Sequence, residues 1–201
     1  QGLTFPIVLR ALLRQDPDVI MIGEIRDAET AVIATEAAMT GHLVLSTLHT
    51  NDAPSAITRL IDMGVKPFLV ASSIQAIMAQ RLVRVICKKC KTVDENPNEK
   101  HLKLLGIDPA ELKKRPVYKG TGCSACSNTG YKGRLGIFEM IELNSEIREL
   151  AFKRAPTTDL RKAARAAGMR TLTGDSAVRK ADAYASNYAP GHFLTAHDDR
   201  H

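Results

Sequence analysis

The stretch that most constrains the fold is a short apolar run that ends on a glycine and a glutamate. Val19–Ile22 are four consecutive large apolar residues without polar alternation, and Pro17 ends what precedes them. Such a run is too short for a helix, and without alternation we expect both of its faces to be covered, as in parallel sheets of α/β proteins. Ligands of open α/β sheets bind at the carboxyl ends of the strands, where Gly23 leaves room for a close approach. The pattern predicts a buried strand that places Glu24 where it faces Mg²⁺ or a water.

A second apolar run ends in the same way. Leu43–Leu48 is preceded by His42 and followed by His49 and two further polar residues, Thr50 and Asn51. The run is again short and apolar, so it predicts a second strand. His49 and its polar neighbours are then expected at the carboxyl end of that strand.

The segment between the two runs is expected to be a helix. Ala28–Met39 is rich in alanine, Asp27 can serve as its N-cap, and Gly41 follows as a C-terminal stop. Strand, helix and strand in this order form a right-handed crossover with two parallel strands. Glu24 and His49 are therefore expected on the same edge of one sheet, the edge where P-loop enzymes handle nucleotide phosphates.

These strand ends belong to longer motifs. The motifs are Gly2–Phe5, Arg10–Asp18, Gly23–Asp27 and Thr40–Asn51. Together they resemble the C-terminal ATPase half of the type II secretion and type IV pilus assembly ATPases, the GspE/PilB family. The resemblance implies an α/β fold with a RecA-like P-loop NTPase core, in which Val19–Glu24 is the Walker B strand.

The resemblance also implies cofactors and roles for three residues. ATP and Mg²⁺ are the implied cofactors, and Glu24 is the acidic residue acting on Mg²⁺ and the attacking water. His42 and His49 correspond to the two histidines of the family's His box, with His49 as the sensor of the γ-phosphate. The alternatives are that Glu24 is only the first solvated residue after a core strand and that His42 is a hydrogen-bonded structural histidine.

One part of a P-loop enzyme is missing from the sequence. None of the thirteen glycines is followed by lysine, so the chain has no G-x-x-x-x-G-K-[ST] loop to hold phosphates. In the family this Walker A loop lies upstream, with the Asp box and the N-terminal domain. Because the chain starts with Gln1 and the motifs begin at once, we expect a piece of a longer protein with a partial core. We expect this piece to be inactive in isolation.

The four cysteines of the chain form two C-x-x-C pairs. They are Cys87 with Cys90 and Cys123 with Cys126. Two such pairs complete a tetrahedral site of four thiolates, the arrangement typical of structural Zn²⁺. Disulfides are the alternative, but they would not persist in a reducing cytosol. We predict one zinc ion that supplies much of the module's folding free energy, on the order of 10 kcal/mol.

The cysteines also bear on the resemblance. A tetracysteine insertion is a feature of the GspE/PilB family, and Gly130–Glu139 matches the motif that follows it there. The plain pilus retraction ATPases lack the insertion. The resemblance therefore favours an assembly or secretion motor, although its motifs do not separate type II secretion from pilus biogenesis.

The cysteine module is rich in basic residues, and the chain has a formal net charge of +6. They are Lys88, Lys89, Lys91, Lys113, Lys114, Arg115, Lys119, Lys132 and Arg134. A zinc-ribbon module that binds nucleic acid or acts in regulation is the alternative function. Only Tyr118 and Tyr131 interleave the basic residues, which argues against specific nucleic-acid binding. A face toward acidic lipids or acidic loops of a membrane partner fits better, and an ordinary solvated surface is the third possibility.

The rest of the pattern predicts helices and one short strand. The predicted helices are Phe5–Leu13, Asn51–Met63, Pro67–Leu82, Ser145–Lys153 and Thr158–Ala167. Thr157 is the expected cap of the last helix, and Val83–Ile86 is an expected strand. Arg81 and Arg84 match a Q-R-L-x-R segment of the family. They face the nucleotide or a neighbouring subunit, or they are solvated or salt-bridged surface residues.

Four divisions of the chain are expected. They are a RecA-like core fragment over 1–86, a tetracysteine zinc module over 87–133, a strand and helices over 134–180, and a divergent, loosely ordered tail over 181–201. The tail resembles nothing in the family and reads as a truncated or frameshifted end.

The resemblance also implies partners and a location. It implies a homo-hexamer in the full-length protein, driven by ATP hydrolysis and acting on inner-membrane platform proteins, with acidic lipids as a further contact. The sequence has neither a run of about 20 apolar residues nor a basic-then-apolar leader. We therefore expect a cytoplasmic protein that is peripherally associated with the inner membrane.

Overall fold

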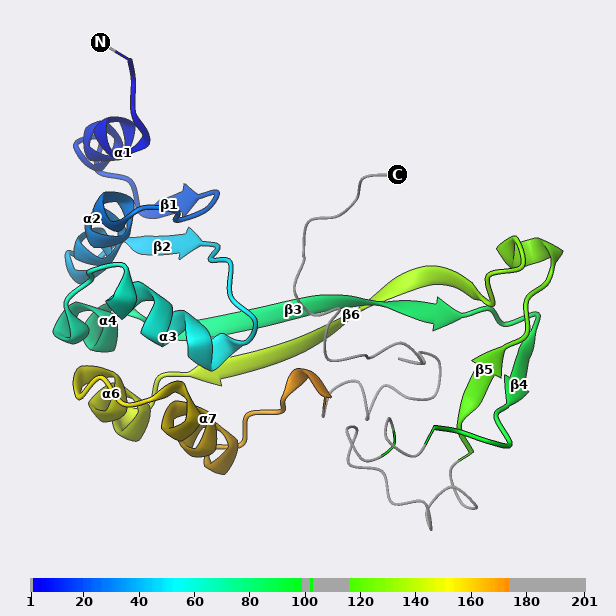
Figure 1. Ribbon diagram of the computed structural model, residues 1–201. Coiled ribbons are helices and arrows are strands. Elements are labelled where there is room, and N and C mark those ends of the chain that lie inside the picture. The colour runs from blue at the N-terminus through cyan, green and yellow to red at the C-terminus, as the bar shows by residue number, and fades with distance from the viewer. Residues whose placement is uncertain (1, 99–101, 103–115, 174–201) are drawn as a thin grey trace. The chain divides into compact units, whose positions relative to one another are not determined.

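The described residues of the computed structural model separate into two compact units (Figure 1). The structure describes residues 2–98, 102 and 116–173. The first unit contains residues 2–79 and 140–169, and the second contains the described residues of 80–139 and 170–173. The expected tail over 181–201 and three basic residues of the module, Lys113, Lys114 and Arg115, lie outside the described residues.

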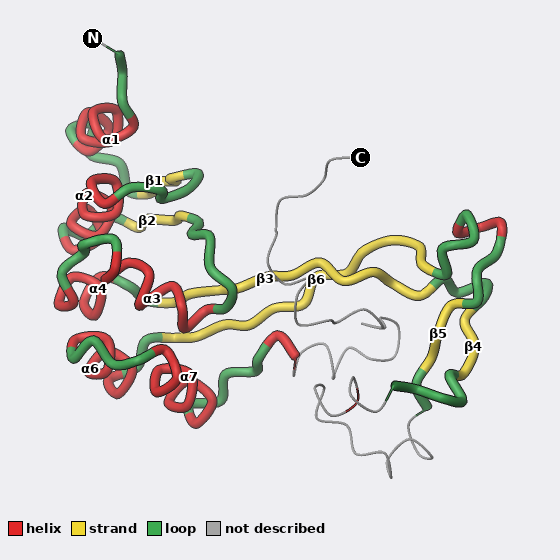
Figure 2. The backbone as a smooth tube through the Cα atoms, viewed as in Figure 1, coloured by secondary structure: helices red, strands yellow, loops and turns green. Residues whose placement is uncertain are grey.

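The first unit is mostly helical, and it also contains one pair of short strands and the ends of β3 (Ala76–Ile86) and β6 (Tyr131–Glu142) (Figure 2). Its elements are α1 (Phe5–Leu13), β1 (Val19–Ile22), α2 (Ala28–Met39), β2 (Leu43–Ser46), α3 (Ala53–Asp62), α4 (Pro67–Ser73), α6 (Ser145–Phe152) and α7 (Thr157–Ala166). Helices from distant parts of the sequence come together here, because α6 packs against α4, and α7 packs against α3 and α6. No helix among the residues that the structure describes is long and apolar enough to cross a bilayer.

The predicted strand, helix and strand are present. β1 and β2 pair in parallel, with Val19 opposite Leu43 and Met21 opposite Leu45. The Asp27 side chain caps α2 by accepting hydrogen bonds from the Thr30 backbone N–H at 2.8 Å and the Thr30 hydroxyl at 2.9 Å. Local cap chemistry therefore sets where α2 begins.

The prediction that both faces of the first strand are covered is wrong for this chain. Ile20 and Ile22 are buried, but Val19 is 55% and Met21 is 79% exposed. Successive side chains of a strand point to opposite faces, so the helical layer covers one face of β1 and leaves the other exposed. The four apolar residues of β1 do not by themselves show which elements cover each face of the strand.

The predicted long helix over Pro67–Leu82 is also wrong. α4 ends at Ser73, the backbone is extended at Ile74, and β3 begins at Ala76 and runs to Ile86. β3 pairs with β6 (Tyr131–Glu142), and this long-range pairing overrides the helical spacing of the apolar residues. The expected short strand is therefore the second half of a longer one, through which the chain passes from the first unit to the second.

The second unit carries the cysteines. Besides parts of β3 and β6 it contains β4 (Lys91–Val93) and β5 (Tyr118–Gly120), which pair antiparallel, and a short 3₁₀ turn over Ser124–Cys126.

In the first unit, one smaller prediction fails: Thr157 is the first residue of α7, and Pro156 precedes it as the N-cap. The proline ring has no atom that can accept a hydrogen bond, so α7 begins without a side-chain cap.

Candidate nucleotide site and metal centre

Glu24 and His49 meet at the carboxyl ends of β1 and β2. His49 Nε2 lies 2.9 Å from Glu24 Oε2. The strand pairing continues beyond the strands, because the Ile25 N–H donates to the Thr47 carbonyl at 3.0 Å and the Thr47 hydroxyl donates to the Gly23 carbonyl at 2.6 Å. Backbone contacts therefore align the two strand ends from which the side chains extend.

A third residue joins this pair. Arg26 Nη2 lies 2.5 Å from Glu24 Oε1, so each carboxylate oxygen of Glu24 has its own nitrogen partner. The hydrogen bond from Arg26, followed by that from His49, holds the pKa of Glu24 below its usual value. Glu24 is therefore ionised at neutral pH, and its side chain is 31% exposed. A half-buried, charged carboxylate of this kind can ligate Mg²⁺ or accept a hydrogen bond from a water.

Arg26 is a site residue that the sequence reasoning missed. The signal in the sequence is the Glu-x-Arg order of Glu24 and Arg26, which brings the two side chains near each other but does not specify their rotamers. The same contact raises the pKa of Arg26.

His42 lies elsewhere. Its Nδ1 is 3.0 Å from the Ala37 carbonyl oxygen and 3.1 Å from the Thr40 hydroxyl, at the C-terminal end of α2. His42 precedes β2 and His49 follows it, so the two histidines stand at opposite ends of the strand. The contacts of His42 are those of a residue that secures a helix end.

The two arginines of the Q-R-L-x-R match lie in the second unit. Arg84 places its guanidinium 4.2 Å from the centroid of the Tyr131 ring, and Arg81 Nη1 donates to the Gln80 carbonyl at 2.8 Å. In the same unit Lys91 lies 4.2 Å from the centroid of Tyr118. Each tyrosine that interleaves the basic residues thus has a cation of this chain over its ring.

All four cysteines meet in one cluster of the second unit. Their sulfur atoms lie within 4.8 Å of one another, and all four are free thiols. Three of the separations are 3.9 Å for Cys87 and Cys123, 3.8 Å for Cys90 and Cys126, and 3.7 Å for Cys123 and Cys126. A tetrahedron with Zn–S bonds of about 2.3 Å has edges of about 3.8 Å, whereas a disulfide needs about 2.05 Å. The donor set therefore fits zinc, and the cysteines are not paired as disulfides.

Backbone N–H groups prepare the cluster for a metal. Burial works to raise the pKa of Cys126, but N–H groups of Cys123 and Gly130 donate to its sulfur and lower that pKa to about 6. Burial raises the pKa of Cys90 to about 11, and hydrogen bonds with the other three cysteines add to the rise. Metal binding requires deprotonated thiols, and a divalent cation would supply the positive charge that compensates them.

Two glycines bring the cysteine turns together. A Cβ atom on Gly120 would lie 2.0 Å from the carbonyl oxygen of Gly130, so the two backbones touch where a side chain would stand. That same carbonyl accepts the Cys87 N–H at 2.9 Å, and the Thr121 N–H donates to the Cys90 carbonyl at 3.1 Å. The first cysteine turn is therefore bonded to the backbone on either side of the second.

The sequence resembles known proteins over most of its length. A family model described as "Type II/IV secretion system protein" matches residues 1–188. The type IV pilus assembly ATPase PilB of Thermus thermophilus is 52% identical over 174 residues, which are 87% of this chain and 20% of that protein. The type II secretion system protein HxcR of Pseudomonas aeruginosa is 51% identical over 173 residues, 86% of this chain and 33% of that protein. The chain therefore spans between a fifth and a third of these relatives.

Two solved structures of ATPases resemble the fold of this chain. The crystal structure of the pilus retraction motor PilT with bound ADP matches with a TM-score of 0.60 and 26% identity, over 93% of this chain and 44% of that one. The Legionella pneumophila ATPase DotB matches with a TM-score of 0.56 over 88% of this chain and 38% of that one, and at 22% identity it supports the fold alone. The fold is the α/β, RecA-like P-loop core that the sequence predicts. By sequence, the chain belongs to the type II/IV secretion system protein family.

Proposed function

We propose that this chain is the Walker B and His-box part of a motor ATPase that drives type II secretion or type IV pilus assembly. The observation that carries the proposal is the 2.9 Å contact between His49 and the ionised Glu24 at the ends of two parallel strands. Family membership and the names of the relatives support it. ATP hydrolysis, hexamer formation and the partners belong to the full-length protein.

In the proposed mechanism Glu24 acts on Mg²⁺ or on the attacking water. Mg²⁺, when bound, neutralises the charge that develops on the transferred phosphoryl group. Arg26 and His49 keep Glu24 ionised, so the carboxylate is ready to accept a hydrogen bond. His49, whose side chain is 59% exposed, can exchange its bond to Glu24 for one to the γ-phosphate and so report whether ATP is present. Phosphate binding itself needs the Walker A loop, and we propose that the chain alone hydrolyses no ATP.

The cysteine module is proposed to hold structural zinc through Cys87, Cys90, Cys123 and Cys126. With it, we propose the divisions 1–86, 87–133, 134–180 and 181–201 as core fragment, zinc module, C-terminal strand and helices, and tail. The proposed assembly is a homo-hexamer at the cytoplasmic side of the inner membrane, in contact with platform proteins. Exposed Lys88, Lys89 and Lys132 are available for acidic lipids or acidic loops.

The zinc-ribbon alternative has less support. A nucleic-acid module of this size would use its aromatic rings to stack on bases. Tyr118 and Tyr131 instead carry Lys91 and Arg84 over their rings. We therefore propose no specific nucleic-acid partner.

The test of the proposal is Glu24→Gln in the full-length protein. The amide keeps the shape but loses the charge, so nucleotide binding is expected to persist while kcat falls by about 10²–10⁴-fold. Nucleotide affinity is measured by titration and turnover by phosphate release. Glu36→Gln, an exposed change on α2, is the matched control. Normal turnover in the Glu24 variant, or turnover by this chain alone, would remove the proposed roles.

A further inference from the structure

The segment that carries His49 is fixed at both of its ends. Residues 47–52, called here the His49 loop, connect β2 with α3. At its start, Thr47 is bonded through its backbone and its side chain to the end of β1. At its end, Asp52 is the N-cap of α3 and accepts the Ser55 N–H at 2.9 Å. Thr47 and Asp52 are therefore the two anchors of the segment that carries His49.

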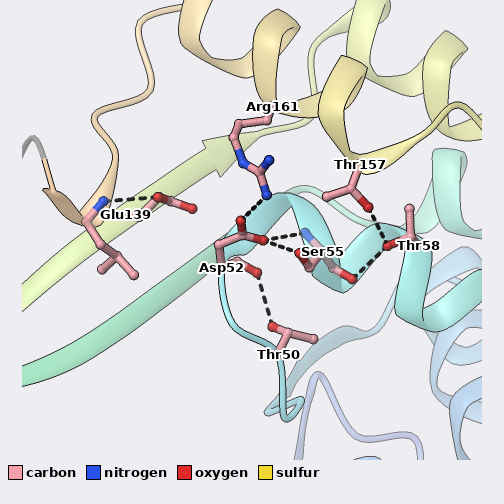
Figure 3. A network of polar contacts seen from close by, with 8 residues as sticks. Thr50, Asp52, Ser55, Thr58, Glu139, Thr157 and Arg161 are labelled. Atoms are coloured by element: carbon pink, nitrogen blue, oxygen red, sulfur yellow. Dashed lines mark hydrogen bonds and ion pairs between the residues drawn. The ribbon is translucent and has the colours of Figure 1, made fainter. Parts of the chain in front are cut away.

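Asp52 is held by a helix from the far end of the described sequence (Figure 3). One of its oxygens accepts the N–H and the hydroxyl of Ser55, and the other accepts a hydrogen bond from Arg161 Nη2 at 2.5 Å. Within the loop, the Thr50 hydroxyl donates to the Asp52 carbonyl at 3.1 Å. One carboxylate thus joins the His49 loop to α3 and to α7.

The contact between Asp52 and Arg161 is better placed than an ordinary surface ion pair. The Asp52 side chain is 19% exposed and that of Arg161 is 39% exposed, whereas Lys162, the next residue on α7, is 82% exposed and lies 3.6 Å from Asp159. Partial burial works to raise the pKa of Asp52, but the hydrogen bonds from Ser55 and Arg161 outweigh it and the pKa is lowered. A partly desolvated, hydrogen-bonded pair of this kind keeps its geometry better than an exposed one.

A second contact fixes the same two helices. The hydroxyls of Thr58 on α3 and Thr157 on α7 lie 3.1 Å apart, and Ile57 and Leu160 beside them are fully buried. α7 therefore offers a firm base from which Arg161 reaches Asp52 (Figure 3).

We propose that Arg161 is a positioning residue for the nucleotide site: by binding Asp52 it fixes the end of the His49 loop and so holds His49 against Glu24. Asp52 follows His49 by three residues, a span of at most about 11 Å. A shift of α7 is thereby transmitted along a short segment to the proposed phosphate sensor. The role in hydrolysis rests on the proposed function, whereas the effect on the loop does not.

The first measurement is amide hydrogen exchange in the full-length protein without nucleotide. Arg161→Met removes a charge-assisted bond to Asp52, so exchange at the Ser55 amide, which donates to the same carboxylate, and at residues 48–52 is expected to rise about tenfold or more. Lys162→Met, on the same helix, is the matched control and leaves these amides unchanged. Arg161→Lys restores part of the protection, because lysine keeps the charge but not the planar guanidinium. Unchanged exchange in Arg161→Met, or the same increase throughout α2 and β1, would overturn the inference.

The second measurement separates binding from turnover. In Arg161→Met, kcat for ATP hydrolysis is expected to fall about tenfold while the Kd for nucleotide stays within about twofold, because the loop positions His49 and does not hold the nucleotide. A raised Kd with unchanged kcat would overturn the positioning role. If the unmodified full-length protein hydrolyses no ATP, the proposed function fails. The exchange measurement still tests whether Arg161 fixes the His49 loop.

Discussion

The two candidate sites of this chain are built in opposite ways. Glu24 and His49 are exposed ends of strands, aligned by backbone pairing, and one face of their sheet is uncovered. Three of the four cysteines are buried, and the cluster is closed by contacts among residues of its own unit. The strand-end site therefore depends on apolar burial elsewhere, through α2, whereas the cysteine cluster depends on what its thiols bind. The comparison separates two sources of stability within one chain.

Removal of zinc should give the largest effect and tests this separation directly. The chain is expected to hold one zinc ion, and a strong chelator to unfold the region from Cys87 to about Cys126, since structural zinc contributes on the order of 10 kcal/mol. β1, α2 and β2 should keep their protection, because apolar burial stabilises them. Elemental analysis gives the zinc content, and hydrogen exchange gives the extent of unfolding. Absence of zinc, or loss of protection in both regions, would contradict the comparison.

Gly120→Ala should have the next largest effect. Its Cβ would lie 2.0 Å from the Gly130 carbonyl oxygen, so the backbones must separate. Overpacking costs about 1–3 kcal/mol, so we expect zinc affinity to fall about tenfold. Gly23→Ala is the matched control, because no atom lies within 4 Å of its added Cβ. Competition with a chromophoric chelator measures both affinities, and equal affinities would refute the role of the glycine contact.

Protonation of Glu24 should have the smallest effect, and it concerns the strand-end site alone. The pKa of Glu24 is lowered from 4.5, first by the hydrogen bond from Arg26 and then by that from His49. The contribution of these bonds to stability is therefore complete above pH 4.5 and is lost as the pH falls through the lowered pKa. Carbon NMR of the Glu24 carboxyl follows this titration separately from zinc release, which acid also causes. A Glu24 pKa at or above 4.5 would show that the contacts are not maintained in solution.

The parts of the fold that the sequence predicted are those set by local chemistry. The bounds of α2 follow from the Asp27 cap and from the glycine after its last turn, and the cysteine spacing predicted the four-sulfur cluster. Two contacts between partners that are distant in sequence were not predicted. β3 extends as a strand because β6 pairs with it, and Arg161 contacts Asp52 across 109 residues. Neither contact leaves a periodic signal in its own segment.

Prediction of the site was partial for the same reason. Glu24 and His49 were expected on one edge, and they meet there, but their roles remain predictions. The contact of Arg26 with Glu24 depends on rotamers at a strand end, which residue spacing alone does not specify. The exposure of Val19 depends on which elements cover that face of the sheet. The sequence shows that the residue is apolar, but not whether the face is covered.

The uncovered sheet face also affects whether separate molecules of this chain associate in solution. Val19 stands opposite Leu43 and Met21 opposite Leu45, so exposed apolar side chains form one continuous strip across both strands. Attraction between such strips on separate molecules opposes the repulsion that arises from a net charge of +6. Dissolved salt screens that repulsion beyond about 8 Å at physiological ionic strength but leaves the apolar attraction in place. Low ionic strength is therefore the condition under which charge keeps the chains dispersed.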